Sequence, residues 1–174
     1  MKRWLHRIAM VAGAVVLLLT GCAAGHPDNT VQPVTADFSC RAVIHYRELE
    51  LEADLTRQTD GKLILAFSKP NSLSGITLGW DGKDMTMELG GMSLFMAAEK
   101  VPESALIRCL LRVLAASHPA GTETDEGYTV TGEAEGMAYV LVCDPVTGLP
   151  LSLTVPEEEL TATFTESERL TDDA

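Results

Sequence analysis

The stretch FSCRAVIHYRELELEADL, residues 38–55, decides the fold. From Phe38 to Tyr46 every second residue is apolar, and mainly polar or basic residues stand between them. This period of two is typical of a β-strand with one buried and one solvated face. The alternation changes phase at Arg47-Glu48 and continues over 49–55. The change of phase predicts either a new strand or one long strand bent across a bulge.

Strand-like segments separated by turn signals follow this stretch toward the C-terminus. Asp-Gly turns stand at 59–62 and 81–84, and Pro70 ends a strand because proline cannot donate to a ladder. We expect further strands, or strand-like pieces, at residues 63–67, 73–80, 85–89, 92–96, 128–130, 137–143, 149–155 and 160–164.

One helix, predicted at about residues 102–116, interrupts the strands. Pro102 suits a first helical position, and Glu103 suits the positive end of the helix dipole. The helix has a broad apolar face, with Arg108 and Arg112 predicted at the edge that meets water. Strands, one helix and more strands predict an α+β domain with an antiparallel sheet curved around the helix.

The N-terminus carries a signal for export and lipid attachment. A basic segment precedes an uncharged apolar run, residues 8–19, that is too short to span a bilayer comfortably. The run ends in Leu19, Thr20, Gly21 and Cys22. This box resembles that of bacterial lipoproteins, and the resemblance implies cleavage before Cys22 and diacylation of its thiol. The alternatives are an ordinary secretory signal with a chance cysteine, or an uncleaved anchor.

This interpretation divides the chain into four parts: a signal peptide (1–21), a flexible tether rich in turn residues (22–36), a folded domain (37–168) and an acidic tail (169–174). The lipid would hold the domain on the extracytoplasmic face of the cell membrane. In a Gram-negative cell the outer membrane is expected, because Ala23 stands where inner-membrane lipoproteins carry aspartate.

Charge and motif content exclude several classes of function. Loss of the signal peptide would leave 10 of the 13 basic residues against 25 acidic ones, a formal net charge of −15. Such a surface repels nucleic acid. No GxSxG, HExxH or phosphate-binding glycine loop is present, and the histidines lack metal-ligand spacing. We therefore expect no enzyme, no cofactor and no metal site.

Three cysteines remain once Cys22 carries the lipid, and an odd number cannot pair completely within one chain. Cys40, Cys109 and Cys143 all have apolar neighbours in strand-like or helix-like segments. Buried free thiols are the favoured interpretation, and one disulfide among the three is the alternative.

Three phrases in the folded part resemble the family of the periplasmic lipoprotein carrier and the outer-membrane lipoprotein receptor, LolA and LolB. They are GKLILAFSKP at 61–70, WDGK at 80–83 and DPVTGLPL at 144–151, in the family's order. The resemblance implies an unclosed antiparallel half-barrel whose concave side is covered by helix. It also implies binding of a lipid, an acyl chain or a lipidated molecule. A LolA-like spore-germination lipoprotein instead binds an enzyme.

A methionine-rich segment, residues 85–96, supplies the candidate binding surface. Thioether side chains are flexible and adapt to variable apolar shapes. The predicted ligand groove is lined by Met85, Met87, Leu89, Met92, Leu94, Ile107 and Leu111. The alternative is that this sheet face packs on the helix and forms no groove. In that case the domain is a surface-tethered adaptor that binds and regulates an envelope protein. A carrier that must diffuse should not be anchored, so Cys22 argues for a stationary receptor, chaperone or scaffold.

Overall fold

The computed structural model describes residues 32–170, and the predicted signal peptide, lipobox and most of the predicted tether lie outside them. Eleven strands, one α-helix and two short 3₁₀ helices make up this part. In chain order they are β1 (Phe38–Tyr46), β2 (Leu49–Arg57), β3 (Leu63–Lys69), β4 (Thr77–Trp80), β5 (Asp84–Leu89), β6 (Met92–Ala97), η1 (Ala98–Lys100), α2 (Leu106–Leu114), β7 (Thr122–Thr124), β8 (Gly127–Ala134), β9 (Met137–Cys143), β10 (Pro150–Val155), η2 (Pro156–Glu158) and β11 (Leu160–Arg169).

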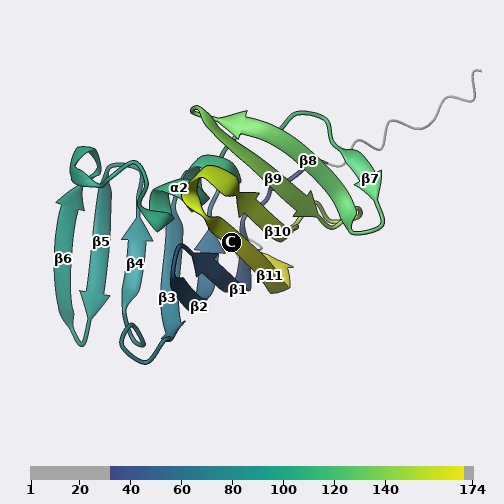
Figure 1. The fold of residues 1–174 in the computed structure, drawn as a ribbon. Helices are drawn as coiled ribbons and strands as arrows, with labels where there is room; N and C mark the ends of the chain where they lie inside the picture. Colours follow the sequence, from purple (N-terminus) through teal and green to yellow (C-terminus); the bar gives the residue numbers. More distant parts are fainter. Residues whose placement is uncertain (1–31, 171–174) are drawn as a thin grey trace, which may run out of the picture. The chain divides into compact units, whose positions relative to one another are not determined.

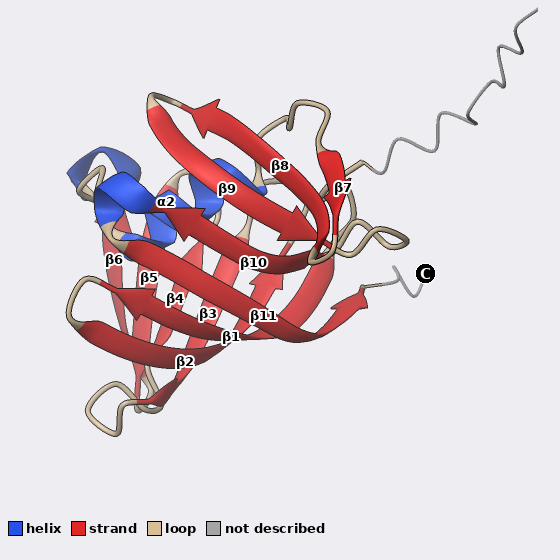
Figure 2. Ribbon diagram, turned by 45° about the vertical axis from the view of Figure 1, so that its right-hand side comes forward, coloured by secondary structure: helices blue, strands red, loops and turns tan. Residues whose placement is uncertain are grey.

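All eleven strands belong to one antiparallel sheet, ordered β6-β5-β4-β3-β2-β1-β11-β10-β9-β8-β7 (Figure 1). Strands β6 and β7 have only one partner each, so the sheet has two edges and does not close. Its strands curve, and helix α2 lies against them on the inner side (Figure 2). The predicted class, an unclosed antiparallel half-barrel with one helix, is confirmed.

The opening stretch forms a hairpin of two strands and not one bent strand. Tyr46 pairs with Leu49 across a two-residue turn, and the register continues without a shift to Phe38 opposite Arg57. Arg47 takes the left-handed backbone conformation, with φ 56°, that such turns require. The turn resets the alternation, so the apolar residues of both strands reach the same buried face.

Helix α2 begins four residues later than the sequence predicts and ends two residues earlier. Pro102 lies in a separate turn, closed by the Ala105 N–H donating to the Pro102 carbonyl at 3.0 Å. Ala105 is extended, with ψ 137°, so the helix cannot start before Leu106. The preference of proline for a first helical position places the start of the helix wrongly at Pro102. The chain first turns inward at Val101, which is 3% exposed, and the helix begins only after the turn that follows.

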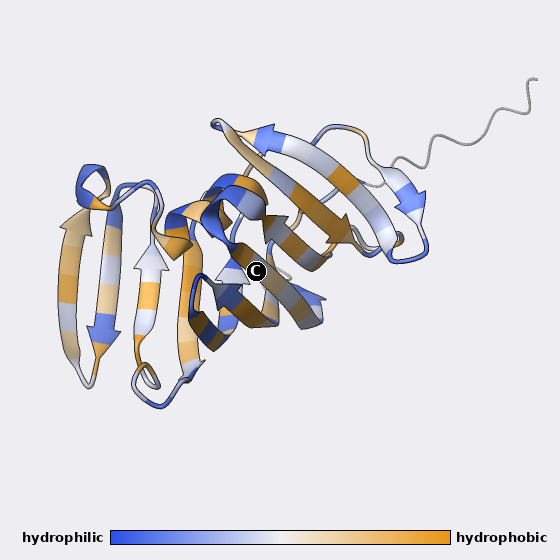
Figure 3. Ribbon diagram, viewed as in Figure 1, coloured by the Kyte–Doolittle hydropathy of each residue, from blue (hydrophilic) through white to orange (hydrophobic). Residues whose placement is uncertain are grey.

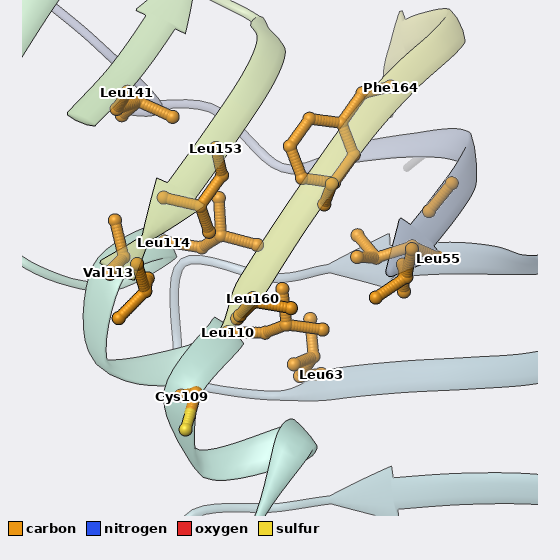
Figure 4. Packing of buried hydrophobic residues seen from close by; sticks show 14 of the residues in the cluster. Leu55, Leu63, Cys109, Leu110, Val113, Leu114, Leu141, Leu153, Leu160 and Phe164 are labelled. Carbon is orange, nitrogen blue, oxygen red and sulfur yellow. The ribbon is translucent and has the colours of Figure 1, made fainter. Parts of the chain in front are cut away.

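The apolar face of α2 fills the inner side of the sheet. Its buried residues are Leu106, Ile107, Cys109, Leu110, Val113 and Leu114. Leu110 and Leu114 pack among sheet residues such as Leu63, Leu153 and Leu160, all of them fully buried (Figure 4). The predicted broad apolar stripe is therefore confirmed, and it belongs to one continuous core.

Several strand boundaries differ from those predicted. The segment 73–80 is strand only from Thr77, because residues 71–75 form a turn whose Leu73 N–H donates to the Pro70 carbonyl at 2.9 Å. Strand β7 was not predicted, since three polar residues show no period. Strand β11 extends to Arg169, one residue into the predicted acidic tail.

The three cysteines of the described domain are free and buried. Burial raises the pKa of Cys40 and of Cys143 to about 12 and that of Cys109 to about 11. Only the thiolate is nucleophilic. In protein whose Cys22 is lipidated or replaced by serine, we therefore expect no reaction with Ellman's reagent at pH 8 in the native state and three equivalents of reaction in denaturant. Rapid labelling without denaturant would contradict this packing.

Candidate functional site

Five of the seven predicted groove residues lie on one face of the β5–β6 hairpin. Met85 pairs with Met96, Met87 with Leu94 and Leu89 with Met92, so their side chains share a face. Leu78 of β4 pairs with Met87 and extends this face by one strand. We call this surface the methionine platform; its residues are Leu78, Met85, Met87, Leu89, Met92, Leu94 and Met96.

The middle row of the platform runs from the buried core to the exposed edge strand. One cross-strand row runs from Leu65 on β3 through Leu78 and Met87 to Leu94. Leu65 is fully buried, Leu78 and Met87 are half-buried, and Leu94 is 52% exposed. In Figure 1 strands β5 and β6 stand apart from α2, and Figure 3 shows apolar colour on both. The helix covers the middle of the sheet and leaves this end open.

The two predicted helix residues occupy other places. Ile107 is 1% exposed and belongs to the packed core beneath the helix. Leu111 is half-buried and lines a cleft of about 340 Å³ beside the helix. Ile107 is therefore closed off in the core, and Leu111 forms part of the cleft wall.

The cleft has both apolar and charged walls. It is lined by Trp80, Arg108, Leu111, Arg112, Ala115, Ala116, Ala134 and Glu135. The guanidinium carbon of Arg108 lies 5.9 Å from the centroid of the Trp80 ring, within cation–π range. Arg108 also donates to the carbonyl of Val101 at 2.9 Å.

Both arginines of the cleft are already neutralised by carboxylates of this chain. Glu103 pairs with Arg108 at 3.1 Å and also with Arg112. Arg112 reaches Glu135, in the β8–β9 turn, at 2.8 Å. The prediction that these arginines meet water is wrong in part, since their side chains are only 21% and 14% exposed. An anionic ligand would have to displace these carboxylates.

A cluster of buried and half-buried polar side chains that the sequence did not reveal lies elsewhere in the domain. Nδ1 of His118 is 2.8 Å from the hydroxyl of Tyr139, and the rings meet edge to face at 5.6 Å. Arg57, only 6% exposed, donates to the carbonyl of Ala36 at 3.2 Å. Isolated polar residues in a strand or a loop carry no sequence signal that places them together.

His118 makes the stability of the domain depend on pH. Burial, and next the charge of Arg57, lower its pKa below the ordinary value of 6.5. The unfolded chain thus binds a proton near pH 6.5 that the folded chain does not, so stability falls as pH drops below 6.5. We expect the urea midpoint to fall less from pH 7.5 to 5.5 in His118→Gln than in wild type. The variant His45→Gln, at an exposed position, should show the same fall as wild type. If the midpoint of His118→Gln also falls as much as that of wild type, His118 is not the cause of the pH dependence.

Residues 32–170 hold no group of three or more His, Cys, Asp or Glu side chains placed to bind a metal ion. Within the same range, no helix has the length and apolar character needed to cross a bilayer. The residues of the predicted lipobox, Leu19 to Cys22, lie outside the described part.

No protein-family model and no curated protein sequence matches this chain. A solved structure of an uncharacterized conserved protein from Thermus thermophilus matches 83% of this chain and 85% of its own, with TM-score 0.53 and 15% identity. A LolA superfamily protein from Nitrosomonas europaea matches 84% and 91%, with TM-score 0.42 and 9% identity. MucB in complex with MucA(peri) matches 78% and 50%, with TM-score 0.36 and 14% identity. The Thermus structure shares the fold of this domain.

Proposed function

We propose that this protein is a lipid-anchored adaptor on the extracytoplasmic face of the membrane, and that its methionine platform binds an envelope protein. The exposed apolar face of β5–β6 is the observation that carries the proposal. Met92 is 70% exposed and Leu94 52% exposed, beside half-buried Met85 and Met87. Clustered apolar exposure of this kind marks an interaction surface on a folded domain.

The shape of the surface favours a protein over a small apolar molecule. Small ligands bind in concave sites that bury most of their surface. Helix α2 fills the inner side of the sheet with its own leucines, and the platform lies open beyond it. A partner protein can cover an open platform, whereas an acyl chain lying there would keep one side in water.

Binding of an acyl chain or a lipidated molecule is the second candidate. The four methionines of the platform favour it, because thioethers adapt to flexible apolar chains. The cleft beside Trp80 and Leu111 could receive only a short part of such a chain. In either case the domain binds and does not catalyse, and Cys22 provides the anchor.

A photo-crosslinking amino acid at position 94 of the full-length chain tests the proposal in native membranes. We expect a discrete protein adduct from position 94 and none from position 146, where the native Val146 is 88% exposed in the β9–β10 turn. Leu94→Gln should then weaken binding of the purified partner at least tenfold, and Val146→Gln should not. Adducts with lipid alone would favour the second candidate, and no adduct at position 94 would refute both.

A further inference from the structure

Strand β6 is an edge strand without the usual protection against pairing. It carries no charge, no proline and no bulge, and its register with β5 has no shift. Met92, Leu94 and Phe95 are all exposed. The opposite edge, β7, is only three residues long and has Glu123 at its centre. Short, charged edges resist addition of a further strand, and long apolar edges invite it.

The free backbone groups of β6 lie at alternate residues. The Gly90-Gly91 turn makes Leu89 and Met92 the closing hydrogen-bonded pair of the hairpin. At the other end the Ala98 N–H donates to the Lys83 carbonyl at 2.9 Å, which is in phase with that pair. The intervening residues Ser93, Phe95 and Ala97 therefore direct their N–H and C=O groups away from β5.

The face of the hairpin opposite the platform carries a charge pattern that a partner strand could match. Phe95, 70% exposed, lies opposite Thr86 of β5. Asp84 and Glu88 lie two residues to either side of Thr86, and both are exposed. Neither carboxylate has an ion-pair partner among residues 32–170. Each stands beside a small β6 residue, Ala97 or Ser93, over which a long side chain can pass.

We infer that an extended segment of the protein partner adds to β6 as a further strand, with lysine or arginine two residues on either side of the residue opposite Phe95. These basic residues would lie about 10 Å, two strand spacings, from Asp84 and Glu88, within reach of a long side chain. In the partner strand, the residues that alternate with these basic residues are apolar, lie on the platform face and extend the platform. The inference rests on the proposed function and specifies its mode of recognition.

Charge also decides against a second copy of this chain as the occupant. Residues 32–170 carry 22 acidic and 10 basic residues, so two copies would repel each other. Pairing of β6 with β6 would also bring no basic residue to Asp84 or Glu88, because the strand has none. A basic segment is attracted by both the whole domain and the two local carboxylates.

A labelled peptide, Val-Lys-Val-Tyr-Val-Lys-Val with blocked ends, tests the inference on the full-length protein in detergent. We expect saturable binding that weakens as salt is raised, and at least tenfold weaker binding when both lysines are glutamate. In the double variant Asp84→Lys and Glu88→Lys this preference should reverse. A preference that is the same in wild type and double variant would overturn the inference.

Phe95→Pro separates strand addition from contact with the platform. Proline removes an outward N–H and the phenyl ring at this edge position, so the β5–β6 pairing is kept and the melting curve reports the fold, while Phe95→Ala controls for loss of the ring. We expect at least a tenfold loss of peptide binding. If Phe95→Pro binds peptide and partner normally while Leu94→Gln loses the partner, strand addition fails and the proposed function stands. A dimer of the full-length chain that Phe95→Pro dissociates would assign the edge to a second copy and overturn the inference.

Discussion

Replacing Leu110 with alanine is expected to lower the free energy of unfolding by about 2–5 kcal/mol. Leu110 is fully buried on the inner face of α2 and packs among Leu63, Leu114 and Leu160 (Figure 4). The substitution removes buried apolar contacts and leaves a cavity that sheet and helix can close only in part. Since a domain of this size has about 5–15 kcal/mol of stability, the loss would be a large fraction of the total.

Urea unfolding followed by circular dichroism measures this effect, and the neighbouring residue supplies the control. Leu111 follows Leu110 in the same helix, is half-buried and lines the cleft. Leu111→Ala should therefore lower stability by clearly less than Leu110→Ala, although helix propensity changes equally. Equal losses in the two variants would show that the helix, and not its packing against the sheet, determines the effect.

The strands could be predicted because most of them bury one face. Ala42 and Ile44 are fully buried while Arg41 and His45 point to water, so burial and alternation coincide. Where burial does not follow a period, prediction failed. Strand β7 is exposed throughout, and residues 71–75 form a turn although Leu73 and Ile76 resemble a strand. The helix start was missed because Ala105 is extended, a conformation set by the chain path and not by local propensity.

The sequence could predict which residues of the β5–β6 hairpin share a face, but not whether that face forms a groove or an open surface. Period two correctly places Met85, Met87 and Leu89 on one face, as cross-strand pairing with β6 confirms. The sequence could not show that this hairpin would lie at the sheet edge, since strand order depends on pairings distant in the chain. For the same reason the sequence could not show that Ile107 would be almost fully buried in the core. Because the β5–β6 hairpin lies at the edge of the sheet, its apolar face is an open platform and not the predicted groove.

The proposed membrane tether and the open apolar platform complement each other. An unprotected apolar edge favours aggregation in a protein that diffuses freely. A domain held at a membrane surface meets partners in the same layer at a raised effective concentration, so a weak interaction can suffice. Anchoring is therefore the condition under which an exposed platform of this kind is useful, and its removal is the strongest test of the function.

Cys22→Ser is expected to abolish incorporation of labelled palmitate into the protein completely. Cys22 supplies the only thiol of the predicted lipobox, and serine offers no thiol for the transfer. Cys143→Ala should incorporate palmitate as wild type does, because Cys143 is buried in the core. Each buried CH₂ of an anchor contributes about 0.8 kcal/mol, so two long chains hold a domain at the bilayer for as long as they remain attached.

The location of the domain is tested by replacing residues 1–22 with a cleavable secretory signal that has no lipobox. We expect the released domain to move from the membrane to the soluble fraction and to keep its unfolding midpoint, because the core lies within residues 34–164. Crosslinking from position 94 should decrease at least tenfold, since the partner would no longer share the same surface. Palmitate labelling of Cys22→Ser, or full crosslinking by the released domain, would refute the anchored adaptor.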